Sequence, residues 1–169
     1  MLGKLAADLR RALVAWIRPP GVFRFDTILA ARAEIRAILA EPRHADPLRL
    51  ERHGFRVYSQ FDEDGIIAEI FRRIGATTRT FVEFGAGGGS ENCTAFLLMQ
   101  GWTGLWIEGS PERYAAIRRL RAPEIARQRL KVVQAFVNPD TIDGLIAGEG
   151  MPGEIDLLVV DIDGNDYHV

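Results

Sequence analysis

The sequence predicts an α/β protein with a doubly wound, mostly parallel sheet of the Rossmann-like type. Four short apolar runs have the length and composition of buried strands: 80–85, 104–109, 131–137 and 156–161. Helical patterns separate them at 91–100, 111–129 and 139–147. Repeated strand–helix units of this length place neighbouring strands parallel and join them by right-handed crossovers. In such a sheet, ligands bind at the carboxyl ends of the strands where the strand order reverses.

Two further helices are expected before the sheet. Leucine and isoleucine recur every three or four residues over 2–17, and a second helix is expected from a cap at Asp26 or Thr27 to about residue 40. This region either caps the main domain or contacts a partner or a membrane surface weakly. The expected organisation is an N-terminal helical extension over 1–42, a linker over 43–57 and a main domain over 58–169.

Cap and turn residues indicate where the helices of the main domain begin and end. A helix is expected over 62–74, with Gly75 just past its end. Ser110 and Asn138 each precede a proline, which is typical of an N-cap followed by proline at the first helical position.

Composition excludes several classes of protein. The 169 residues are 47% hydrophobic and 26% charged, which is typical of a globular domain, and the single cysteine excludes a disulfide scaffold. No apolar run is long enough to cross a membrane and no signal-peptide pattern is present, so a cytoplasmic protein is expected. The net charge of −2 gives no indication of a nucleic-acid partner, and we interpret the prevalence of arginine among the basic residues as coding bias.

A glycine-rich segment directly follows the first strand, at Gly85-Ala86-Gly87 and the two glycines beyond. Glycines between a strand and a helix let the backbone lie against a ligand where a Cβ would collide. Glu83 precedes the first glycine by two residues, which disfavours a pyrophosphate and favours an amine or a sulfonium. Glu108 ends the second strand, where an acid accepts the hydroxyls of a ribose. The two carboxylates predict a nucleoside ligand that carries positive charge and no phosphate.

Acidic residues also follow the fourth strand. Alternation along the strand places Asp161 and Asp163 on one side, at the edge of the sheet where ligands bind. They could orient a substrate hydroxyl, act as a base, hold a divalent cation, or simply belong to a turn. We assign no metal ligand. Cys93 is expected to be a packing residue.

Taken in order, these motifs resemble the class I S-adenosylmethionine-dependent methyltransferases, and within them the FkbM-like group. The matching segments are 58–60, 63–64, 81–87, 91–94, 101–108 and 160–167. The resemblance extends over about 58–169 and does not reach the N-terminal helices.

The resemblance implies a sheet whose first four strands have the order 3-2-1-4, with S-adenosylmethionine over the end of the first strand. Glu83 would face the methionine amine, Glu108 would bind the ribose, and Ser59 and Gln60 would come over the site. The third strand ends without an acid for the adenine amine, and Phe136 is the candidate for packing on the ring. The cofactor-binding set implied is Gln60, Glu83, Gly85, Ala86, Gly87, Glu108 and Asp161.

The leading hypothesis is a methyltransferase that acts on an oxygen of a small molecule or a sugar, with Asp161 and Asp163 as catalytic candidates. One alternative is a nicotinamide-dependent oxidoreductase, although Ser90 stands where its loop needs a third glycine or alanine. Another is a non-catalytic or truncated Rossmann-like fragment. The family's fold has three more strands than this chain supplies, so the C-terminal part of the fold is expected to be missing.

Overall fold

The computed structural model describes residues 33–34, 36–37, 39–162, 164 and 166–168. The chain divides into two compact units, Met1–Arg49 and Leu50–Val169. The first unit contains the 3-10 helix η1 (Pro42–His44), whereas the helix predicted over 2–17 and most of the one predicted to end near residue 40 lie outside the described residues. None of the helices in the described part of the chain has the length and apolar character needed to span a membrane.

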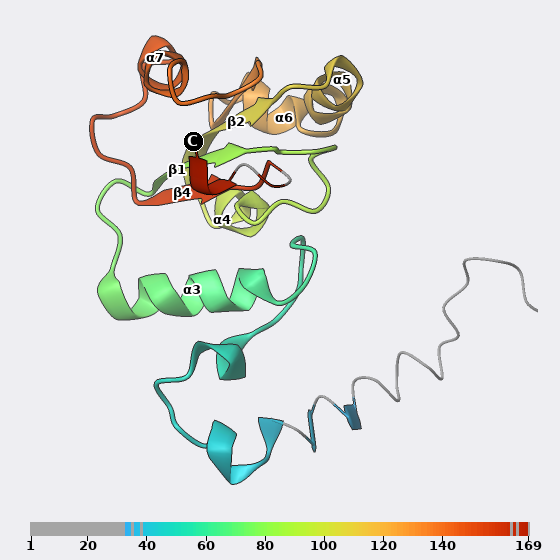
Figure 1. Cartoon of the computed structure of the whole chain (residues 1–169), viewed down its shortest axis with the longest axis vertical. Coiled ribbons are helices and arrows are strands. Elements are labelled where there is room, and N and C mark those ends of the chain that lie inside the picture. The colour runs from blue at the N-terminus through green and yellow to red at the C-terminus, as the bar shows by residue number, and fades with distance from the viewer. Residues whose placement is uncertain (1–32, 35, 38, 163, 165, 169) are drawn as a thin grey trace, which may run out of the picture. The chain divides into compact units, whose positions relative to one another are not determined.

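The second unit is built around a parallel sheet of four strands (Figure 1). They are β1 (Thr80–Phe84), β2 (Thr103–Glu108), β3 (Leu130–Gln134) and β4 (Leu157–Val160). The order β3-β2-β1-β4 confirms the doubly wound arrangement and the strand order that the family resemblance implies. In the register, Glu83 of β1 lies beside Trp106 of β2 and Val159 of β4.

Helices cover the sheet on both faces because side chains alternate along each strand. On one face, Phe81 and Trp106 pack with helices α3 to α6, and on the other, Phe84 and Ile107 pack with α7. Figure 1 shows α7 on one side of the sheet and α3 and α4 on the other. The helices are α3 (Glu63–Ile74), α4 (Ala95–Met99), α5 (Pro111–Leu120), α6 (Ala122–Ala126) and α7 (Ile142–Gly148). The helix that connects β3 to β4 is α7, which lies on the opposite face from the helices that connect β1 to β2 and β2 to β3. With right-handed crossovers, this change of face places β4 on the other side of β1, so the strand order reverses there.

The single helix predicted over 111–129 is wrong, because two short helices meet at Arg121 instead. Pro123 has no N–H to donate to the carbonyl four residues earlier, and its ring would clash with that carbonyl. The predicted start is confirmed: the hydroxyl of Ser110 accepts the backbone N–H of Arg113, and proline follows it in the first turn.

Two other helices begin later than predicted. α7 begins at Ile142 with Thr141 at its N-cap position, after a turn in which the Oδ1 of Asn138 accepts the N–H groups of Asp140 and Thr141. The helix predicted over 91–100 is confined to α4, because residues just before it donate their N–H groups to a carboxylate of β1.

The strand ends differ from the prediction by one to three residues, most at β3. Glu108, the last residue of β2, lies beside Gln134, and β3 ends there because no strand partner continues. Residues 135–137 leave the sheet and line a cavity. At the other edge, Leu158 of β4 is half exposed.

Candidate functional site

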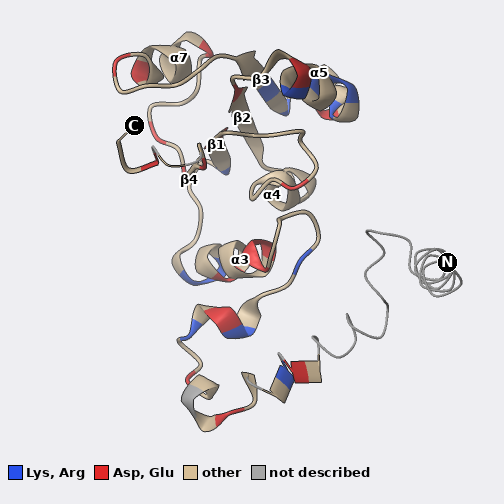
Figure 2. Ribbon diagram, turned by 45° about the vertical axis from the view of Figure 1, so that its right-hand side comes forward, with Lys and Arg blue, Asp and Glu red and all other residues tan. Residues whose placement is uncertain are grey.

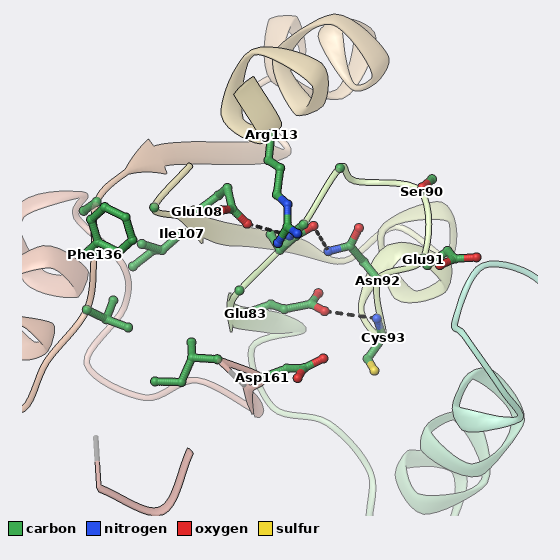
Figure 3. Close-up of a pocket in the computed structure, with 18 of the residues that line it drawn as sticks. Glu83, Ser90, Glu91, Asn92, Cys93, Ile107, Glu108, Arg113, Phe136 and Asp161 are labelled. Atoms are coloured by element: carbon green, nitrogen blue, oxygen red, sulfur yellow. Dashed lines mark hydrogen bonds between the residues drawn. The ribbon is translucent and has the colours of Figure 1, made fainter. Parts of the chain in front are cut away.

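A cavity of about 630 Å³ lies where β1, β2 and β4 end (Figure 3). Small-molecule sites have volumes of about 300–1,000 Å³, and in doubly wound folds they lie where the strand order reverses. All the residues that the sequence predicts for the cofactor line this cavity: Gln60, Glu83, Gly85, Ala86, Gly87, Glu108 and Asp161. The structure therefore brings these predicted residues together at one cavity.

The glycine loop has a left-handed backbone at several positions, among them Gly85 with φ 71° and Gly87 with φ 54°. A Cβ on Gly85 would collide with the backbone of Asp161, whereas a Cβ on Gly87 would meet nothing closer than 4.0 Å. Close approach within the protein itself therefore requires glycine at position 85. There, the protein's own β4 end fills the space.

Glu108 is a buried carboxylate held by backbone groups on both sides. Its Oε2 accepts the N–H of Gly87 at 2.7 Å, and its Oε1 accepts the N–H of Ser110 at 2.8 Å. The side chain is 5% exposed and lines the cavity. Each carboxylate oxygen accepts two hydrogen bonds, so each keeps one acceptor position for a ligand hydroxyl.

Glu83, on β1, is held in a similar way by donors of the segment that leads into α4. Its Oε1 accepts the N–H of Cys93 at 3.1 Å, and its Oε2 accepts the N–H and the hydroxyl of Thr94. Burial raises the pKa of Glu83 above its usual range, although these hydrogen bonds oppose the shift. A cation bound in the cavity would favour the ionised form of this carboxyl.

The cavity wall is acidic. Among its described residues, four carboxylates face one guanidinium, that of Arg113. The carboxylates are Glu83, Glu91, Glu108 and Asp161. Other basic side chains of this unit lie on α3 and α5 and are not part of the cavity wall (Figure 2). The cavity therefore favours a ligand with net positive charge.

Gln60 reaches the cavity because Asp64, near the start of α3, holds the segment before it. One carboxylate oxygen of Asp64 accepts the N–H groups of Val57, Tyr58 and Ser59 at 2.6 to 3.0 Å. Ser59 is fully buried, accepts the N–H of Asp64 and is absent from the cavity wall described by the structure. Of the two residues expected to come over the site, the structure brings only Gln60 to it.

The acids after β4 have different environments. Asp161 is exposed and lines the cavity, with its side chain on the same side as Glu83 in Figure 3. Asp163 lies outside the described residues. Asp166 accepts the N–H groups of Ile162 and Gly164, which lower the pKa of its carboxyl and make it part of the turn.

Cys93 and Asn92 also line the cavity. Burial and the nearby Glu83 raise the pKa of the Cys93 thiol to about 12, so the thiol stays protonated at neutral pH. The amide of Asn92 is buried and donates to the carbonyl of Ala86 at 2.9 Å, which ties the segment before α4 to the glycine loop.

Two residues of this region were not singled out from the sequence: Arg113, and Arg121, whose guanidinium bonds to the glycine loop from outside the cavity. The one sequence signal for Arg113 is its position in the first turn of the helix that follows Glu108, where a helix N-terminus faces the ligand edge of the sheet.

No protein-family model and no curated protein matches the sequence. Among solved structures, the chain is similar to SAH-bound methyltransferase PaMTH1 of Podospora anserina, with 19% identity, a TM-score of 0.49, and 87% of this chain and 63% of that chain covered. The O-methyltransferase of Bacillus cereus in complex with SAH has 16% identity, a TM-score of 0.42 and coverages of 92% and 62%. The glycopeptide N-methyltransferase MtfA has 22% identity, a TM-score of 0.40 and coverages of 59% and 45%. The chain therefore spans less than two thirds of these proteins.

Proposed function

We propose that this protein is an S-adenosylmethionine-dependent methyltransferase. The observation that carries the proposal is that backbone donors in two segments of the cavity wall, at Gly87 and just before α4, are already bound to the protein's own carboxylates. Gly87 donates to Glu108, and the N–H groups before α4 donate to Glu83. A dinucleotide cofactor needs such N–H groups for its pyrophosphate. A nicotinamide cofactor would instead meet two carboxylates, so it is the weaker candidate.

The cavity suits the charge and the hydroxyl groups of the proposed cofactor. Both oxygens of Glu108 are oriented by the backbone, and their remaining acceptor positions fit the two hydroxyls of a ribose. Glu83 and Asp161 supply negative charge for the ammonium and the sulfonium. Phe136, which also lines the cavity, is 81% exposed and would lose that exposure by packing on adenine.

The chain's own residues would align the acceptor and take its proton. When bound, S-adenosylmethionine supplies a methyl group on a positively charged sulfur, and transfer breaks the carbon–sulfur bond as the acceptor bond forms. Alignment of the acceptor in line with that bond is the protein's main contribution. Asp161 lies at the cavity and is exposed, so its carboxylate can accept the proton of an acceptor hydroxyl. Asp163 is proposed as its catalytic partner.

The acceptor that we propose is a hydroxyl of a small molecule or a sugar, which the cavity volume supports. Membership of the FkbM-like group and a cytoplasmic location remain part of the proposal. They rest on the sequence motifs and on the composition, respectively.

Replacing Glu108 with glutamine tests the proposal. Glu108→Gln keeps the shape of the side chain and removes the charge and one acceptor, so the affinity for S-adenosylhomocysteine should fall about tenfold or more by calorimetry. Glu154→Gln, on an exposed residue away from the cavity wall, is the matched control and should leave the affinity unchanged. Equal affinity in the Glu108 variant and the wild type would contradict the assignment of the ribose to Glu108.

A further inference from the structure

Arg121 is a buried arginine that touches the glycine loop from behind. It lies where α5 meets α6, is 7% exposed and is not among the residues that line the cavity. Its Nε and Nη2 both donate to the carbonyl of Gly89, at 3.1 and 2.8 Å, across 32 residues of sequence. A planar guanidinium can make this paired contact, which a lysine ammonium cannot reproduce.

Two aromatic rings hold the guanidinium in place. Its carbon lies 5.1 Å from the centre of the Tyr58 ring and 5.5 Å from that of Trp106. Within the described part of the chain, no carboxylate forms an ion pair with Arg121. The rings and the carbonyl therefore stabilise the buried charge, and together they fix the plane of the guanidinium.

Through Gly89, this contact determines the direction of the donor that holds Glu108. The N–H of Gly89 donates to the carbonyl of Ala86 at 3.2 Å and closes a tight turn over residues 86–89. Gly87 lies inside that turn, and its N–H donates to Glu108 at 2.7 Å. Arg121 holds the last carbonyl of the turn, so its loss would release the segment that orients the Gly87 N–H.

Through Trp106, the same guanidinium supports the donor that holds Glu83. The indole N–H of Trp106 donates to the hydroxyl oxygen of Thr94 at 2.7 Å. An indole nitrogen only donates, so the single hydroxyl hydrogen of Thr94 is left for Glu83, whose Oε2 lies 2.5 Å away. Packing of Arg121 over the Trp106 ring helps to fix the indole from which this chain of bonds starts.

We propose that Arg121 is a positioning residue that orients both carboxylates of the cavity, Glu108 through the glycine turn and Glu83 through Trp106 and Thr94. It acts from outside the cavity and touches no ligand. Tyr58, on which the guanidinium also packs, precedes Gln60 by two residues, so the same contact anchors a third segment of the cavity wall. Only the role of these carboxylates in binding a ligand rests on the proposed function.

Amide hydrogen exchange tests the proposal without any ligand. Arg121→Met removes both donors and the charge, so exchange of the Gly87 and Gly89 amides should accelerate about tenfold or more. The amide of Asp156, which donates to the carbonyl of Thr80 at the opposite end of the sheet, should change far less. Arg119→Met, at an exposed residue of α5, is the matched control and should accelerate neither group. Arg121→Lys should give an intermediate effect.

Two results of the exchange experiment would overturn the proposal. One is equal acceleration of the Gly87, Gly89 and Asp156 amides, because a purely structural role would loosen the whole sheet. The other is unchanged exchange at Gly87 and Gly89. Calorimetry with S-adenosylhomocysteine then separates this proposal from the function: failure of the wild type to bind would count against the function alone. Wild-type affinity in an Arg121→Met protein with accelerated loop amides would show that this positioning has no effect on the ligand and would also overturn the proposal.

Discussion

The carbonyl oxygen of Asp161 lies 1.7 Å from the position that a Cβ on Gly85 would occupy. Gly85 directly follows β1 and Asp161 directly follows β4, and the N–H of Asp161 donates to the carbonyl of Phe84 at 3.3 Å. The absence of a side chain at Gly85 thus lets the ends of two neighbouring strands come together. This contact brings the glycine loop and Asp161 to the same cavity.

Gly85→Ala should therefore be strongly destabilising. The methyl group would collide with backbone that cannot rotate away, and the φ of 71° is itself unfavourable for alanine. We expect a loss of about 2 kcal/mol or more in the free energy of unfolding, measured by urea denaturation. Gly88→Ala is the matched control in the same loop, because a Cβ there meets nothing within 4 Å. Equal stability of the two variants would contradict the close approach.

Acid should weaken the binding of a ligand whose ammonium group pairs with Glu83, because burial raises the pKa of this carboxyl. The amine of the ligand pairs with the ionised carboxylate, so affinity is full where Glu83 is ionised and falls as protonation begins. This loss should begin at a higher pH than for a carboxyl with the ordinary value of 4.5. Calorimetric titration with S-adenosylhomocysteine between about pH 5 and pH 8 measures it. Glu83→Gln should bind more weakly and with little pH dependence, and a variant that keeps the wild-type pH profile would rule out this role.

The thiol of Cys93 should react slowly with alkylating agents. With its pKa raised to about 12, the thiolate at pH 8 is roughly a thousandfold scarcer than for a thiol of pKa 9. We expect alkylation by iodoacetamide at pH 8 to be at least about a hundredfold slower than for glutathione. The chain has one cysteine, so mass spectrometry reports this residue alone, and the protein unfolded in urea should react at the ordinary rate. A folded-state rate near that of glutathione would refute the prediction.

Asp156 should stabilise the loop that leads into β1. Its carboxylate accepts the N–H groups of Thr77, Thr78 and Arg79, and these contacts lower its pKa below the ordinary value of 3.8. A lowered pKa in the fold means that this stabilisation is present above that value and is lost as the pH falls further. Asp156→Asn should thus unfold at lower urea concentration than the wild type at pH 7, with a smaller difference in acid.

Asp140→Asn, at an exposed aspartate, controls for the loss of one charge and should match the wild type at both pH values. If the Asp156 variant lost the same amount of stability at neutral and acidic pH, the ionised carboxylate would not be the cause.

The sequence predicts the meeting of Glu83, the glycines and Glu108, because the carboxyl ends of neighbouring parallel strands share one edge of a sheet. It does not predict how those carboxylates are held, since the donors on Gly87 and Thr94 depend on the fold of two loops. Arg121 left no local signal, because its partner lies 32 residues away and arginine is abundant throughout the chain.

The same reason explains why the start of α4 was missed. Apolar runs and caps such as Ser110 are local, and they located the strands and the start of α5. The start of α4 shifted where the side chain of Glu83, on β1, accepts backbone N–H groups. Side chains that compete for the backbone in this way act against helical periodicity.

Calorimetric titration of the protein with S-adenosylhomocysteine and, separately, with NAD⁺ tests the central claim most directly. The occupied backbone donors and the acidic wall predict saturable binding of S-adenosylhomocysteine with a Kd of about 1 μM or tighter, and no saturable binding of NAD⁺. Saturable binding of NAD⁺ without binding of S-adenosylhomocysteine would contradict the account.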